Sequence, residues 1–331
     1  MFKNINIPLT LIICLIIFYI TFNVFIVENF VVKSGKKMGK SKLKKKIINK
    51  KSVVKIETPK PSEIWGINDA NEIWKAQLPC SDDNKCSWIP LGDSLKQVSQ
   101  GNNEIWGIDI DGNIKYCPNT INSPCKDSED WKDVSGNLEK ISVGTNDIWG
   151  IDANGNVKYC NNKTSQCKNG LNRWSKIQGT LKQISVGKDD IWGIDIDNKI
   201  KYCNNKTSQC KKGVNTWSEI LSPMSQDKKR VIFNQISVGE NDVWGVLTNG
   251  DIYKCNKECK AKNCFKRCKN DSWQRVQGKL EQISVGNDAV WGVTPDKKIQ
   301  YCINNKNYPC SAKEPVWKTI DDHNLSNISI N

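Results

Sequence analysis

A Trp-Gly dipeptide flanked by branched apolar residues occurs six times in this chain, and its recurrence limits the possible folds more than any other feature. The tryptophans of these dipeptides are Trp65, Trp106, Trp149, Trp192, Trp244 and Trp291. They follow one another at 41, 43, 43, 52 and 47 residues. A period of this length indicates one supersecondary unit copied in tandem. A ring of near-identical units is typical of a binding scaffold, and a single catalytic centre is less expected.

The residues around each dipeptide predict four short β-strands per unit. In the third unit, the strands are expected at 138–144, 147–152, 156–160 and 174–177. Each segment alternates or is β-branched, and Gly, Asn or Asp bounds it, as is typical of strands and turns. Asn154-Gly155 stands between the second and third strands, where a tight hairpin turn needs positive φ. Six such antiparallel sheets arranged radially form a six-bladed β-propeller, so we predict this all-β fold.

The two ends of the repeat complement each other. The first unit has its Ile-Trp-Gly strand at 64–66 but no inner strand before it, because Lys-Pro-Ser precedes it. Residues 325–330 match the inner-strand pattern Leu-x-Gln-Ile-Ser-Val of the other units. We therefore predict that this C-terminal segment pairs with the strand around 63–68. Such pairing closes the ring and removes the exposed edges that an open array would leave.

Tryptophan recurs at a second position of every unit, where it opens the outer strand. This second set comprises Trp88, Trp131, Trp174, Trp217, Trp273 and Trp317. Of the thirteen tryptophans, Trp74 alone lies outside the two sets. Recurrence in every unit favours packing between blades over ligand stacking. The inner strands carry small residues, as expected near a crowded axis: Ser142, Ser185, Ser237 and Ser284.

Fourteen of the fifteen cysteines lie in the repeat, at regular spacing. An even number in this arrangement predicts a disulfide framework and an oxidising compartment. We expect one cysteine to end the third strand and its partner to lie in the following loop. The expected pairs are Cys80–Cys86, Cys117–Cys125, Cys160–Cys167, Cys203–Cys210, Cys255–Cys268, Cys259–Cys264 and Cys302–Cys310. A zinc site is the alternative for the four cysteines of the fifth unit.

The N-terminal part differs sharply from the repeat. Residues 9–27 carry no charge over nineteen positions, which predicts an uncleaved single-pass transmembrane anchor over 1–32; a cleaved signal peptide is the alternative. Residues 33–60 hold twelve lysines and one acid, a net charge of +11. We interpret this segment as a solvated linker that can also bind anionic lipid headgroups. A nucleic-acid arm is a third interpretation.

Residues 61–331 form the propeller domain, and their charge is small. The whole chain carries +14, residues 33–60 carry +11 and residues 1–32 are neutral, which leaves +3 for the repeat. Nucleic acid is therefore an unlikely partner of the propeller.

Two signals disagree about the side of the membrane. The lysines after the anchor place the propeller in the cytosol by the positive-inside rule. The cysteines and the candidate glycosylation sites at Asn162, Asn205 and Asn270 place it outside. Fourteen regularly spaced cysteines outweigh a statistical charge bias. We expect a propeller on the extracytosolic side or on a virion surface.

The repeat pattern Leu-x-Gln-Ile-Ser-Val-Gly, Ile-Trp-Gly-Ile, Gly-x-Ile-x-Tyr-Cys and a closing Trp resembles the tectonin repeat, over residues 62–331. This family includes tachylectin-like and fish-egg lectins. The resemblance implies a six-bladed propeller that recognises carbohydrate or lipopolysaccharide-like ligands through loops at the blade edges. The anchor and the lysine linker depart from those secreted lectins and favour display on a membrane.

The sequence contains no set of residues that suggests catalysis, a cofactor or a histidine metal site. Its single histidine, His323, stands beside the predicted closing strand. In five units an acid stands two residues before the Trp of the dipeptide. In the sixth unit Ala289 takes that position, and Asp288 stands just before it. The resulting ring of candidate ligand-binding residues is Glu63, Glu104, Asp147, Asp190, Asp242 and Asp288. The alternative is structural, since short carboxylates accept hydrogen bonds from nearby backbone amides.

Two classes of function remain after this survey. The first is a membrane-anchored, lectin-like, carbohydrate-binding propeller. The second is a non-enzymatic scaffold for protein–protein interactions, displayed on a membrane or virion surface. The tryptophans are expected to be structural, so the ligand should contact the loops that vary between units.

Overall fold

The computed structural model describes residues 62–80, 85–163, 165–206, 208–257, 268, 272–305, 310 and 315–330. Contact clustering divides the chain into Met1–Glu57 and Thr58–Asn331, and the described residues all belong to the second unit. The predicted anchor over 9–27 and the lysine-rich linker over 33–60 lie outside them. Within the described residues, no helix is both long and apolar enough to cross a bilayer.

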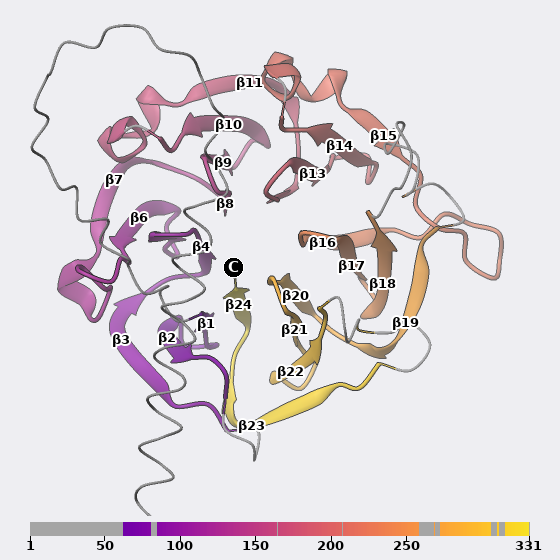
Figure 1. Ribbon diagram of the computed structural model, residues 1–331. Helices are drawn as coiled ribbons and strands as arrows, with labels where there is room; N and C mark the ends of the chain where they lie inside the picture. The colour runs from indigo at the N-terminus through magenta and orange to yellow at the C-terminus, as the bar shows by residue number, and fades with distance from the viewer. Residues whose placement is uncertain are drawn as a thin grey trace, which may run out of the picture. The chain divides into compact units, whose positions relative to one another are not determined.

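The described strands form six four-stranded antiparallel sheets arranged as a ring around a central axis (Figure 1). This confirms the six-bladed β-propeller. We number the blades 1 to 6 in chain order, and we call the contact between consecutive blades a seam. The inner strands are β24 (Asn327–Ile330), β4 (Gln97–Gln100), β8 (Lys140–Val143), β12 (Gln183–Val186), β16 (Phe233–Val238) and β20 (Gln282–Val285).

Each inner strand pairs with the Trp-Gly strand of its own blade. These second strands are β1 (Glu63–Ile67), β5 (Glu104–Ile108), β9 (Asp147–Ile151), β13 (Asp190–Ile194), β17 (Asp242–Leu247) and β21 (Ala289–Val293). The third strands are β2 (Glu72–Gln77), β6 (Asn113–Pro118), β10 (Asn156–Asn161), β14 (Ile200–Asn204), β18 (Asp251–Asn256) and β22 (Lys298–Ile303). The outer strands are β3 (Trp88–Ser94), β7 (Lys132–Asn137), β11 (Ser175–Thr180), β15 (Ser218–Ile220), β19 (Gln274–Lys279) and β23 (Lys318–Asn324).

Short 3₁₀ helices occupy the connections from the third to the outer strand in three blades. They are η2 (Ser128–Asp130), η3 (Ser165–Asn169), η4 (Leu171–Arg173), η5 (Ser208–Lys212) and η6 (Val214–Thr216). The sequence pattern does not reveal them, because segments of three to five residues are too short to show a helical period.

The predicted closure of the ring is confirmed. The last strand, β24, runs antiparallel to β1, with Ile330 opposite Ile64 and Ile328 opposite Gly66. Figure 1 shows the two ends of the described chain side by side at this blade. The register also explains the glycine of the dipeptide. A Cβ at Gly66 would lie 2.1 Å from Cδ1 of Leu325, so only glycine leaves room for this leucine.

The tryptophans of the dipeptides form the packing between blades. Trp65, Trp106, Trp149 and Trp244 have no exposed surface. Each meets the outer-strand tryptophan of the following blade edge-to-face. The four pairs and their ring-centroid distances are Trp65–Trp131 at 6.3 Å, Trp106–Trp174 at 6.0 Å, Trp149–Trp217 at 5.8 Å and Trp244–Trp317 at 6.5 Å. Aromatic pairs of this geometry contribute about 0.5–1.5 kcal/mol beyond their buried area.

Six disulfides join cysteines that the sequence analysis pairs. They are Cys80–Cys86, Cys117–Cys125, Cys160–Cys167, Cys203–Cys210, Cys255–Cys268 and Cys302–Cys310. The expected Cys259–Cys264 pair lies outside the described residues. Blade 1 differs from the expected register, because β2 ends at Gln77 and Cys80 follows in the loop.

Removal of residues 324–331 is expected to destabilise the propeller severely. The deletion removes β24, exposes the edge of β1 and eliminates the buried side chains of Leu325 and Ile328. Losing two buried aliphatic residues costs at least about 4 kcal/mol. Thermal unfolding followed by tryptophan fluorescence measures the effect, with deletion of Asn331 alone as the control. A truncated protein that unfolds at the temperature of the full chain would contradict the closure.

Candidate functional site

The carboxylates expected to form a ligand-binding ring lie mainly inside the seams. Glu104, Asp147, Asp190 and Asp242 are 5–8% exposed. Glu63 is half-buried. Asp288 is exposed, and Ala289 rather than Asp288 occupies the strand position that the acid holds in the other blades. The five acids in register are therefore poorly placed to present their carboxylates to solvent. Their role as ligand-binding groups stays a prediction.

Each of these five carboxylates bonds a side chain of the next blade. The partner stands two residues after the first cysteine of that blade in every case. The pairs are Asn119 with Glu63 at 2.8 Å, Asn162 with Glu104, Asn205 with Asp147 at 2.7 Å, Lys257 with Asp190 at 2.8 Å and Asn304 with Asp242 at 2.9 Å. A buried carboxylate requires such donors, because an unpaired charge in a low-dielectric seam is costly. The acids thus join consecutive blades.

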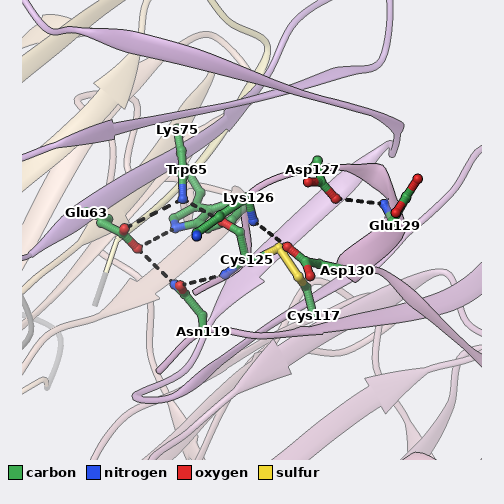
Figure 2. The surroundings of a disulfide bond; sticks show 10 residues. All are labelled: Glu63, Trp65, Lys75, Cys117, Asn119, Cys125, Lys126, Asp127, Glu129 and Asp130. Carbon is green, nitrogen blue, oxygen red and sulfur yellow. Dashed lines mark hydrogen bonds and ion pairs between the residues drawn. A yellow bond between two sulfur atoms is a disulfide. The ribbon is translucent and has the colours of Figure 1, made fainter. Parts of the chain in front are cut away.

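Figure 2 shows the seam between blades 1 and 2 around the Cys117–Cys125 disulfide. Asn119 donates to Glu63, and Trp65 Nε1 donates to the same carboxylate at 3.4 Å. Lys75 Nζ donates to the carbonyl oxygen of Cys125 at 2.5 Å and lies 5.4 Å from the centroid of the Trp65 ring. The lysine therefore binds a backbone oxygen of the next blade while its charge faces an indole.

Blade 5 also places a lysine of its third strand over the indole of its own blade. At the seam between blades 2 and 3 the lysine comes instead from the following blade. Lys254 lies 5.0 Å from the Trp244 ring centroid and donates to Cys310 O at 2.6 Å. Burial lowers the pKa of Lys254, and the nearby Asp242 carboxylate opposes this shift. In blade 2, Tyr116 takes the equivalent strand position, and Lys168 of blade 3 lies 4.8 Å from its ring centroid. The cation over the aromatic ring thus comes from either side of the seam.

Among the described residues, the seam between blades 6 and 1 has no pair of acid and amide. Ala289 replaces the acid and Leu78 replaces the asparagine, and both pack against the same apolar cluster. His323 fills the outer part of this seam. Its ring centroid lies 4.2 Å from that of Trp74 and 5.3 Å from that of Trp88. The histidine is half-buried between two indoles.

A cavity of about 350 Å³ opens at the seam between blades 4 and 5, and a smaller one of about 260 Å³ opens at the seam between blades 3 and 4. The larger cavity lies where the seam departs from the pattern of the others. Here Trp273 packs on Phe233, at a centroid distance of 4.9 Å. Lys257 replaces the asparagine that pairs with the seam acid elsewhere. Trp192 and Tyr202 line the cavity, with ring centroids 5.0 Å apart.

Charged groups of both blades form the rim of this cavity. Lys188 of blade 4 and Glu240 of blade 5 are 3.3 Å apart and more than half exposed. Lys206 Nζ lies 3.0 Å from the Asp189 carboxylate on the blade 4 side. Below them, the buried Asp190 carboxylate accepts from Trp192 Nε1 at 2.9 Å. The cavity thus combines an aromatic wall with exposed hydrogen-bonding groups of both signs.

Of the predicted ligand-binding residues, this cavity includes only Asp190; it also includes Cys268 of the predicted Cys255–Cys268 disulfide. Sequence reasoning missed Lys188, Asp189 and Glu240. One signal was present, because the spacing of 52 residues between Trp192 and Trp244 marks blade 4 to blade 5 as the irregular step. That spacing alone does not identify rim residues.

Two of the three candidate glycosylation sites have structural partners. The Nδ2 atoms of Asn162 and Asn205, to which a glycan would be attached, donate to Glu104 and Asp147. The third, Asn270, lies outside the described residues. Glycosylation of Asn162 and Asn205 stays a prediction, although a glycan at either atom would compete with a bond across a seam.

The zinc alternative finds no support in blade 5. Cys255 and Cys268, two of its four candidate ligands, form a disulfide. Among the described residues, no group of three or more His, Cys, Asp or Glu side chains is arranged to hold a metal ion.

Replacing Asn205 with Ala is expected to destabilise the protein by about 1–3 kcal/mol, because the buried Asp147 carboxylate loses a donor. The Thr207→Ala variant is the matched control, since it removes the same glycosylation motif and keeps Asn205. Urea unfolding of both variants measures the free energy of unfolding. Equal losses in the two variants would assign the effect to a glycan, and no loss in either would contradict the pairing.

Comparisons with known proteins give one matching family and several similar solved structures. The Tectonin domain family model matches residues 46–233, 173–267 and 229–331. A search of curated proteins returns no match. Among solved structures, Prp20p from Saccharomyces cerevisiae is 12% identical, with a TM-score of 0.49, over 82% of this chain and 75% of that one. Human WBSCR16 is 11% identical, with a TM-score of 0.45, over 78% of each chain.

A third similar structure is YCF48 from Cyanidioschyzon merolae, which is 10% identical, with a TM-score of 0.43, over 81% of this chain and 87% of that one. Identities this low carry no information about function. The family model, by contrast, covers most of the chain, including every described blade. The chain therefore belongs to the Tectonin domain family.

Proposed function

We propose that this protein is a lectin-like module that binds carbohydrate in the cavity between blades 4 and 5. The cavity itself carries the proposal, because it joins the partly exposed ring of Tyr202, which packs against the buried Trp192, to an exposed polar rim. Aromatic faces pack against the C–H surfaces of sugar rings. Carboxylates and ammonium groups such as those of Glu240 and Lys188 bond sugar hydroxyls. A volume of about 350 Å³ suits one or two sugar rings.

We further propose that the propeller is displayed on a membrane, outside the cytosol or on a virion surface. Residues 9–27 supply an apolar stretch of bilayer length, and the lysines of 33–60 supply charge for anionic headgroups. Six disulfides support an oxidising compartment. Glycans or lipopolysaccharide-like molecules on a facing surface are the proposed ligands. We assign no catalytic activity and no cofactor.

A protein-interaction scaffold is the second candidate, and one observation favours it. The connection from β15 to β16 spans residues 221–232 and carries three exposed apolar side chains. Leu221, Met224 and Ile232 are 41%, 49% and 47% exposed. Exposed apolar side chains that gather on one connection can mark a protein contact.

The Glu240→Ala variant is expected to weaken sugar binding about tenfold, because it removes one hydrogen-bonding carboxylate from the rim. A glycan array with the full-length protein first identifies the sugar class, and titration with that free sugar measures the dissociation constants. Glu139→Ala is the matched control, because Glu139 is similarly exposed and also pairs with one lysine but lies away from the cavity. A blank array would favour the scaffold. Equal affinities of the wild type and both variants would place the sugar elsewhere.

Membrane display predicts two results for the protein expressed in its host membrane. Alkaline carbonate should leave it in the membrane fraction, because an apolar span resists extraction. Thiol titration of the unreduced, denatured protein should detect at most three thiols, since twelve of the fifteen cysteines form disulfides. Release by carbonate would contradict the anchor, and twelve or more thiols would contradict the oxidising compartment.

A further inference from the structure

The inner strands of neighbouring blades are joined by side-chain amides at one end of the central axis. In blade 2, Gln97 Oε1 accepts from the N–H of Ile141 at 3.0 Å, and Gln97 Nε2 donates to the carbonyl oxygen of the same residue at 3.0 Å. The amide therefore bonds the edge of the next inner strand as a backbone peptide group would. Gln183, Gln235 and Gln282 bond Ile236, Ile283 and Ile328 in the same way.

Blade 1 completes this series with a shorter amide. Asn327 Oδ1 accepts from the N–H of Val98 at 3.3 Å. Five of the six inner-strand edges thus receive an acceptor oxygen from a side-chain amide of the preceding blade. These acceptors matter because a buried backbone N–H without a partner costs about 1–3 kcal/mol.

The seam between blades 3 and 4 breaks the series. Lys140 occupies the position of the glutamine, and a lysine side chain has no acceptor atom. The N–H of Ile184 therefore lacks the side-chain acceptor that its counterparts have. The serine bond beside it is kept, since Val186 N–H donates to Ser142 Oγ at 3.0 Å. The two inner strands are consequently in their usual register, and only one acceptor oxygen is missing.

A cavity of about 740 Å³ lies at this end of the axis and reaches the break. Its wall includes the amide residues of the other five blades together with Lys140. Ile184 is the only inner-strand isoleucine among the described residues of this wall. The inner-strand edge is thus open to the cavity where the amide is absent, and closed where it is present.

The charges around the cavity also distinguish Lys140. Lys96 pairs with Glu139 at 3.0 Å, and Lys182 donates to the side-chain oxygen of Asn198. Lys140 is half-buried, and its side chain makes no hydrogen bond or ion pair with any described residue. Glu281, the one acid among the described residues of the wall, pairs with Lys297. Lys140 is therefore the lysine of this wall whose ammonium has neither an acid nor an amide as a partner, and it stands on the strand edge that faces the Ile184 N–H.

We propose that the mouth of the axis binds an oxyanion, namely a carboxylate, phosphate or sulfate group, between Lys140 and the N–H of Ile184. One oxygen of the anion takes the place of the missing glutamine oxygen and accepts from Ile184. The Lys140 ammonium balances its charge, and charge-assisted hydrogen bonds of this kind are about twice as strong as neutral ones. This site lies at the strand ends opposite to the loops that form the carbohydrate cavity, and it is independent of that proposal.

Calorimetric titration of the full-length protein with inorganic phosphate, sulfate and acetate tests the site at constant ionic strength in chloride. We expect saturable binding of at least one of the three. The Lys140→Gln variant should raise the dissociation constant at least about tenfold, because it restores the amide oxygen and removes the charge. The same variant should unfold at a higher temperature than the wild type in chloride alone, since Ile184 gains its acceptor.

Two further variants separate this site from a general effect of positive charge. Lys182→Gln removes a lysine from the same cavity wall and should leave anion affinity within about twofold of the wild type. Lys140→Met removes the charge without supplying an acceptor, so it should weaken binding but not raise the unfolding temperature. Equal losses in Lys140→Gln and Lys182→Gln, or no saturable binding to the wild type, would overturn the proposal. The relative affinities for the three anions identify which oxyanion the site prefers.

Discussion

The hydrogen bonds between inner strands are the interaction on which the rest of the ring depends. An inner strand pairs with its own blade along one edge, and its other edge faces the neighbouring blade with unpaired N–H groups. Serine hydroxyls satisfy one N–H per seam at 2.9–3.1 Å in all six seams. This ring of six bonds includes Ser329 of the last strand, so it forms only when the chain ends have met. Closure therefore completes the hydrogen bonds of the two seams that flank the last strand.

The chain keeps this framework constant and exchanges residues in complementary sets around it. Where a seam has an acid, the next blade supplies Asn or Lys; where Ala289 replaces the acid, Leu78 replaces the amide. Where a lysine stands on the third strand, as at Lys254, it lies over the indole of its own blade. Where a tyrosine stands there in blades 2 and 3, the lysine over its ring comes from the next blade. Each exchange preserves a satisfied seam, because leaving either partner alone in a buried seam costs several kcal/mol.

Much of this fold is predictable from sequence because each constraint repeats. Six copies of Trp-Gly establish the blades, and the segment 325–330 establishes the closure, since it completes a pattern that five other units show. The sequence analysis did not predict that the acids bond side chains of the next unit. Asp147, for example, accepts from Asn205, which is 58 residues away. The serines were expected to be small, whereas they also accept hydrogen bonds across the seams. Recurrence indicates which residues pack between units, but it does not say which side chain of one unit bonds which side chain of the next.

In a repeat protein of this kind, the residues that recur are occupied by holding neighbours together. Ser142, Asp147 and Trp149 recur in most units, and each bonds or packs within a seam. Most of their hydrogen-bonding atoms and most of their surface are used within the seams. Binding groups must therefore be sought where a unit departs from the pattern without a complementary change in its neighbour. Lys140 is such a departure at the axis, since the edge it faces is unchanged. The seam between blades 4 and 5 keeps its acid paired through Lys257, but its rim carries Lys188 and Glu240, which are largely exposed. At the closing seam both partners change together, which explains why apolar packing there leaves the ring intact.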